Sequence, residues 1–135
     1  MKLLKITLLF TFLIGISTTT IAQTNVNEVP EGQIFTPKDK DFLQLWYYDQ
    51  VLKMDLDEDG RYDYLALLTY YTYKMTRLAL PKYKLNDAQQ KEQFDILTQK
   101  LDAEMQDFLS PENYAIHKES FTIIVEKVYT QKNWE

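Results

Sequence analysis

The chain has 135 residues with 15 Lys and Arg against 20 Asp and Glu, which gives a formal net charge of −5 at pH 7. Nucleic-acid phosphates repel such an acidic chain, so we expect no nucleic-acid partner. It contains no cysteine, so its stability must come from an apolar core, bound metal or oligomerisation rather than from disulfides.

The first 22 residues have the pattern of a secretory signal peptide. Lys2 and Lys5 form a positive start, residues 8–16 form an apolar core too short to span a bilayer comfortably, and Thr20 and Ala22 precede a cleavage site. No cysteine follows the apolar core, which excludes a lipoprotein anchor. We therefore predict a secreted or periplasmic protein, cleaved after Ala22 and then free of the membrane. An uncleaved anchor is the alternative.

Residues 23–37 show no periodicity, which predicts a flexible leader before a single domain over residues 38–135. A helical pattern follows Pro37. Its spacing places four apolar residues on one face, namely Phe42, Leu45, Trp46 and Leu52. This helix runs directly into an acidic stretch.

A second helical pattern follows the acidic stretch and ends before Pro81. Its apolar positions are Tyr64, Leu68, Tyr71, Met75 and Leu78. Residues 70–73 favour strands, and residues 64–68 can also be read as a strand. An α+β fold with a strand after the acidic stretch is therefore the alternative.

Two further helices are expected in the C-terminal half. Asn86 can cap the N-terminus of the third helix, with Gln89 completing a capping box. Ser110 and Pro111 end the third helix and can start the fourth. Their apolar positions are Phe94, Leu97, Leu101, Met105 and Phe108, then Phe121, Ile124, Val125 and Val128. The β-branched run 122–125 leaves a C-terminal strand open. The predicted fold is a small, mainly α domain with a C-terminal helical hairpin.

The acidic stretch Asp55–Asp63 reads D-L-D-E-D-G-R-Y-D and is the strongest candidate for a binding site. Calcium takes roughly 6–8 oxygen ligands, and alternate residues of a tight loop can supply them. The predicted ligands are Asp55, Asp57, Asp59, the Arg61 carbonyl and Asp63. Gly60 stands where such a loop turns sharply, in a conformation that glycine adopts without strain.

This stretch resembles the first half of an EF-hand loop, a resemblance that implies a helix, a calcium loop and a second helix. At position 12 of an EF-hand loop, counted from Asp55, a glutamate binds calcium with both oxygens, but this chain has Ala66 there. Asp63 is therefore expected to supply a carboxylate ligand instead, and the calcium affinity is expected to be modest. The D-x-D-x-D-G-x-x-D pattern is also similar to the loops of FG-GAP and VCBS repeats, which implies a strand after Asp63 and a cell-surface interaction module. A solvated turn without an ion is the third interpretation.

Residues 85–89 and 109–113 both place a capping residue after a leucine and before a helix. They resemble degraded copies of the L-T-x-x-Q motif of periplasmic Spy/CpxP-like proteins. That resemblance implies a helical chaperone or envelope-stress sensor that binds unfolded clients. Two ordinary capped helices are the alternative interpretation.

The sequence contains no catalytic constellation, so an enzyme is not expected. His117 is the only histidine and is expected at the surface. Most of the aromatic residues that flank the acidic stretch are expected in the core, with a binding platform as the alternative; they are Trp46, Tyr47, Tyr48, Tyr70, Tyr71 and Tyr73. We predict that the chain is a small secreted or periplasmic calcium-binding protein. The alternatives are a cell-surface interaction module with a protein partner and a Spy-like chaperone or stress sensor with unfolded clients.

Overall fold

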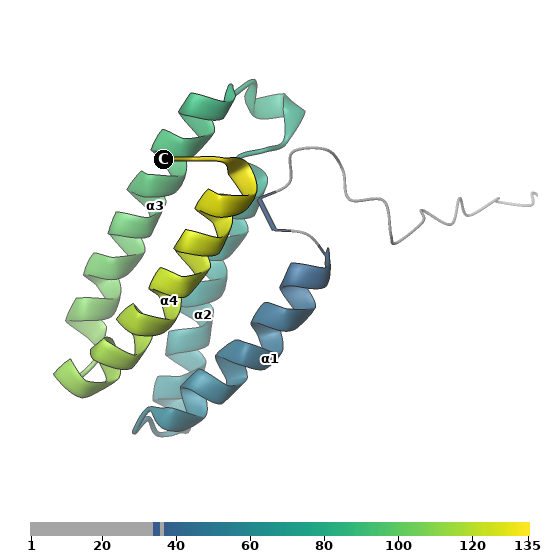
Figure 1. The fold of residues 1–135 in the computed structure, drawn as a ribbon. Coiled ribbons are helices and arrows are strands. Elements are labelled where there is room, and N and C mark those ends of the chain that lie inside the picture. Colours follow the sequence, from purple (N-terminus) through teal and green to yellow (C-terminus); the bar gives the residue numbers. More distant parts are fainter. Residues whose placement is uncertain (1–33, 36) are drawn as a thin grey trace, which may run out of the picture.

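The computed structural model describes residues 34, 35 and 37–135 (Figure 1). Its elements are α1 (Pro37–Lys53), α2 (Glu58–Arg77), the 3-10 turn η1 (Pro81–Tyr83), α3 (Asp87–Phe108) and α4 (Pro111–Lys132). The predicted signal peptide and most of the predicted leader lie outside the described residues. The mainly α fold is confirmed.

Both strand alternatives are wrong for this part of the chain. Residues 64–68 lie inside α2 and residues 122–125 lie inside α4. The β-branched and aromatic residues there keep the 3.6-residue spacing of an amphipathic helix, and burial of that face outweighs their local preference for strands. None of the helices in the described residues combines the length and apolar character that crossing a membrane requires.

Capping side chains fix where α3 and α4 begin. The Asn86 side chain accepts from the Gln89 amide at 2.8 Å, and the Gln89 side chain accepts from the Asn86 amide at 2.9 Å. Ser110 accepts from the Asn113 amide at 3.2 Å, and Pro111 occupies the first helical position. The predicted capping box and the predicted start of α4 are confirmed.

The four helices form an open bundle. α2 packs against α3, α3 packs against α4, and α4 packs against α1, which is inclined to the other helices (Figure 1). An ion pair of 2.7 Å between Lys127 on α4 and Asp39 on α1 supports the last of these contacts. Because α1 packs against α4, α1 and α2 are the outer helices in this order of packing.

The core is formed by the predicted faces of α2, α3 and α4. The buried residues of these helices include Tyr64, Leu68, Tyr71, Met75, Phe94, Leu101, Met105, Phe121, Ile124 and Val128. Leu78, Leu97 and Val125 are partly buried against this core. The prediction failed at Phe108, which is 41% exposed in the last turn of α3.

The predicted buried face of α1 is wrong. Leu45 is 74% exposed and Leu52 is 53% exposed, while Tyr47 and Val51 are buried. Trp46 is partly buried, and the side chain of Phe42 lies outside the described residues. The helix carries two apolar stripes, and the one that reaches α4 is buried.

Both ends of the described chain join the core. Ile34 and Phe35, which the sequence analysis assigned to the leader, are buried. At the other end, Asn133 adopts φ 54° and ends α4. This turn directs Trp134 back onto Phe94, with ring centroids 5.6 Å apart.

Candidate functional site

The acidic stretch forms the start of a helix rather than an extended loop. Asp57 is the N-cap of α2, and its Oδ1 accepts a hydrogen bond of 2.7 Å from the Gly60 amide. Asp59, Arg61 and Asp63 then lie in the first two turns of α2. Acidic residues are favoured here because the helix N-terminus carries a partial positive charge.

Gly60 does not make the sharp left-handed turn that we expected. It lies inside α2, where a Cβ atom on this residue would come within 2.9 Å of the Asp57 Oδ1. The missing side chain therefore leaves room for the capping carboxylate. The contact with the cap, and not a turn, is therefore what favours glycine at this position.

The five predicted calcium ligands are close in sequence but not arranged around one point. Asp55, Asp57, Asp59, Arg61 and Asp63 are all exposed. Among the described residues, no three His, Asp or Glu side chains lie grouped so as to hold a metal ion. A calcium ion bound by all five would require the first turns of α2 to unwind, and calcium binding stays a prediction.

A buried asparagine ties this stretch to the start of α4. The Asp55 amide donates to the Asn113 Oδ1 at 3.0 Å, and the Asn113 Nδ2 donates to the Asp55 carbonyl at 3.2 Å. Asn113 is 5% exposed. Asn113 thus fixes the connection between α1 and α2.

His117 is buried, and the expectation of a surface histidine is wrong. Its Nδ1 lies 3.0 Å from the Tyr64 hydroxyl, and its ring stacks on Phe121 at 5.6 Å between centroids. Burial lowers the pKa of His117 to about 4, although the negative charge of Asp102 partly opposes this shift. The imidazole is therefore neutral at neutral pH and serves as a hydrogen-bonding core residue.

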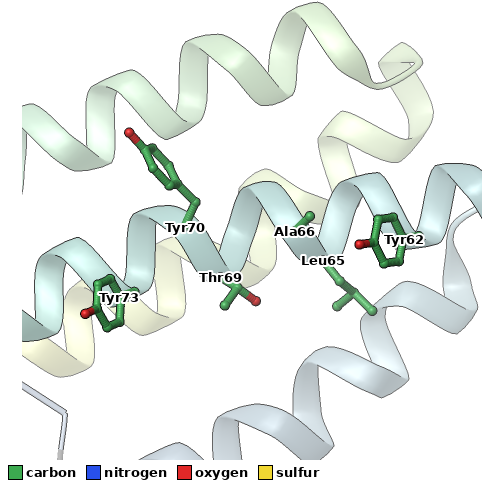
Figure 2. Close-up of a pocket in the computed structure, with 6 residues that line it drawn as sticks. All are labelled: Tyr62, Leu65, Ala66, Thr69, Tyr70 and Tyr73. Carbon is green, nitrogen blue, oxygen red and sulfur yellow. The ribbon is translucent and has the colours of Figure 1, made fainter.

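The most unusual surface lies on α2, on the side opposite its core residues. We define the outward face of α2 as Tyr62, Leu65, Ala66, Thr69, Tyr70 and Tyr73. These six residues line a shallow groove that is open to solvent, with Tyr70 at the edge toward α3 (Figure 2). The outward face of a surface helix normally carries charged and polar residues.

Exposure is high along this face. Tyr62 is 75% exposed, Tyr73 is 58% exposed and Tyr70 is 52% exposed. The expectation that most of the flanking aromatic residues are in the core is therefore wrong. Tyr47 and Tyr71 are buried, Trp46 is partly buried, and Tyr48, Tyr70 and Tyr73 are exposed.

Two cations lie beside the tyrosines of the outward face. The Lys74 Nζ lies 4.2 Å from the Tyr70 ring centroid. The Arg77 guanidinium lies 5.0 Å from the Tyr73 ring centroid and donates to the Tyr73 hydroxyl at 2.6 Å. These contacts orient both cations along the border of the face.

Helix α1 repeats this arrangement on a smaller scale. Leu45, Tyr48 and Leu52 are exposed at helical spacing, on a side next to the one that carries Tyr47 and Val51. The two outer helices of the bundle thus each carry apolar residues on two sides. One side of each helix packs in the core, and the other is exposed in this structure.

Comparisons of this chain with protein-family models, with curated proteins and with solved structures find no match. The resemblances to EF-hand, FG-GAP, VCBS and Spy/CpxP-like proteins therefore stay predictions. The sequence carried a signal for it, because Tyr62, Ala66, Thr69 and Tyr73 follow helical spacing on the side opposite Tyr64.

Proposed function

We propose that this chain is an exported, non-enzymatic protein-interaction module that binds through the outward face of α2. The single observation behind this proposal is that α2 is apolar on two opposite sides. One side packs in the core through Tyr64 and Met75, whereas the other exposes Tyr62 and Tyr73. Export follows from the predicted signal peptide, and it places the module in the periplasm or outside the cell.

The chemistry of the face favours a protein surface as its ligand. Tyrosine supplies a large apolar area and a hydroxyl while losing little conformational entropy on binding. The groove is shallow and open, whereas small-molecule sites enclose most of their ligand. An extended apolar and aromatic surface of this kind is typical of protein contacts.

The test is site-specific photo-crosslinking in cells that express the full chain. A crosslinking residue is placed at Thr69, in the centre of the face, and at Glu119, an exposed position on α4, as the control. We expect defined protein adducts from position 69 that position 119 does not give. If the two positions give the same pattern, the proposed function is wrong.

Calcium binding by Asp55–Asp63 is a second proposal. It is favoured by four aspartates within nine residues, none of which takes part in the ion pairs found among the described residues. Close carboxylates repel one another, and a cation relieves that repulsion. Without a bidentate glutamate the affinity is expected on the order of 10⁻⁴ to 10⁻³ M.

Calorimetric titration with calcium and with magnesium tests this second proposal. The variant Asp55→Ala plus Asp59→Ala is the control. We expect heat on titration with millimolar calcium that the variant lacks, together with a fall in helicity as the first turn of α2 unwinds. Absence of both heat and a thermal shift in the wild-type protein would refute it.

A further inference from the structure

The outward face of α2 is complementary to itself when one copy is reversed. Its centre has the small side chains of Ala66 and Thr69, and its ends have the large rings of Tyr62 and Tyr73. If two such helices pack antiparallel, each Tyr62 lies opposite a Tyr73 of the second copy. The small central residues then allow the two helix axes to approach closely.

The charges beside this face are complementary in the same arrangement. Asp59 and Asp63 are exposed near the start of α2, while Lys74 and Arg77 lie near its end. At 3.6 residues per turn, all four fall on the same flank of the face. The flank is therefore acidic at one end of the helix and basic at the other.

We propose that the occupant of the outward face is a second copy of this chain, packed with its α2 antiparallel in a two-fold symmetric dimer. The inference rests on the proposed function and names its partner. In such a dimer the matching flanks of the two helices meet, as an isologous interface requires. Asp59 then faces Arg77 of the second copy, and Asp63 faces Lys74, with each pair occurring twice.

A parallel arrangement of the two helices does not form these pairs. A two-fold axis that runs along the helices would put the charged flanks of the two copies on opposite sides of the interface, so the acidic and basic ends would not meet. The same distribution of charge also stabilises α2 itself, through its helix dipole. The dipole alone, however, does not account for the tyrosines between the charged ends.

The tyrosine contacts prepare the basic end for this pairing. Lys74 lies against Tyr70 and Arg77 against Tyr73, so both cations are held at the border of the face before a second copy arrives. Less side-chain entropy is lost on pairing when a charged group is already positioned. With one helix from each copy, the interface is small, and we expect a reversible dimer rather than an obligate one.

The experiment is sedimentation equilibrium of the exported, purified protein over a wide range of concentration. One variant reverses the acidic end with Asp59→Lys plus Asp63→Lys, and the other reverses the basic end with Lys74→Asp plus Arg77→Asp. A matched control, Glu119→Lys plus Glu126→Lys, makes the same change in net charge as the first variant, on exposed residues of α4. Circular dichroism checks that every variant remains folded.

We expect each reversal alone to weaken self-association about tenfold or more, because four close charge pairs become repulsive. The α4 control should self-associate like the wild type. Mixing the two reversed variants should restore association as a heterodimer, because each acidic end then meets a basic end again. Combining all four substitutions in one chain should restore the homodimer.

Two outcomes would overturn the proposal. One is a wild-type protein that stays monomeric at every concentration, and the other is a mixture of the reversed variants that fails to associate. If a variant does not fold, Ala66→Arg tests the same contact at its centre and should abolish the dimer. A monomer that still crosslinks another protein through position 69 would refute the dimer alone, whereas no adduct at that position would refute the proposed function.

Discussion

The buried His117 should make the fold sensitive to mild acid. Its pKa is lowered from 6.5 to about 4, with burial as the largest cause, so the folded state binds a proton less readily than the unfolded state. A depressed histidine pKa gives stability that is fully present above pH 6.5 and is lost as the pH falls through 6.5 toward 4. From these values the loss is about 2 kcal/mol at pH 5 and about 3 kcal/mol below pH 4.

The substitution His117→Gln removes the group that titrates. We expect the variant to be less stable than wild type at pH 8, because a well-packed ring is lost. Between pH 8 and pH 5, however, its free energy of unfolding should fall by about 2 kcal/mol less than that of wild type. Urea unfolding followed by circular dichroism at the two pH values measures this difference.

A second variant separates burial from hydrogen bonding. Tyr64→Phe removes the hydroxyl that lies 3.0 Å from the His117 Nδ1 but leaves the ring in the core. Because burial is the main cause of the shift, this variant should keep the acid sensitivity. The chain has one histidine, so its pKa can also be read directly from one NMR titration curve. A pKa near 6.5, or equal losses in wild type and His117→Gln, would refute the reasoning.

Three further substitutions test individual contacts by urea unfolding at pH 8. Asp57→Ala removes the N-cap of α2 and should cost about 1 kcal/mol; an unchanged stability would show that this carboxylate does not cap the helix. Asn113→Ala leaves the Asp55 amide and carbonyl without their partner and should cost about 1–3 kcal/mol. The exposed control Glu119→Ala should change stability by less than about 0.5 kcal/mol. Trp134→Ala should cost about 3 kcal/mol, because the Trp134 ring packs on Phe94. A loss as small as that of the exposed control would mean that the C-terminus does not join the core.

The core faces of α3 and α4 could be predicted because each of these helices has one dominant apolar stripe, and in α2 the predicted stripe from Tyr64 to Met75 is the buried one. α1 could not be predicted in the same way. Leu45 and Leu52 mark one stripe, Tyr47 and Val51 mark another, and both pairs have helical spacing. Which of them is buried depends on the position of α4, and this is a property of the packing and not of the local sequence.

The acidic stretch was ambiguous for a different reason. A cation loop and a helix N-terminus both favour aspartate at the first positions, since both place negative charge near a positive centre. The hydrogen bond between Asp57 and Gly60 shows that this stretch forms a capped helix N-terminus. The periodicity that identified Phe121 could also have found His117, which lies one turn earlier on the same side of α4.

The order of packing has a consequence for how the molecule opens. α2, α3 and α4 contact their neighbours along the chain, whereas α1 is attached to α4 through partners such as Asp39 and Lys127, 88 residues apart. Contacts between distant residues form late in folding, and an edge element with fewer partners opens at lower free energy. In native-state hydrogen exchange the amides of α1 should therefore exchange as a group before those of α3. We expect α1 to detach while α2, α3 and α4 stay packed as a three-helix unit.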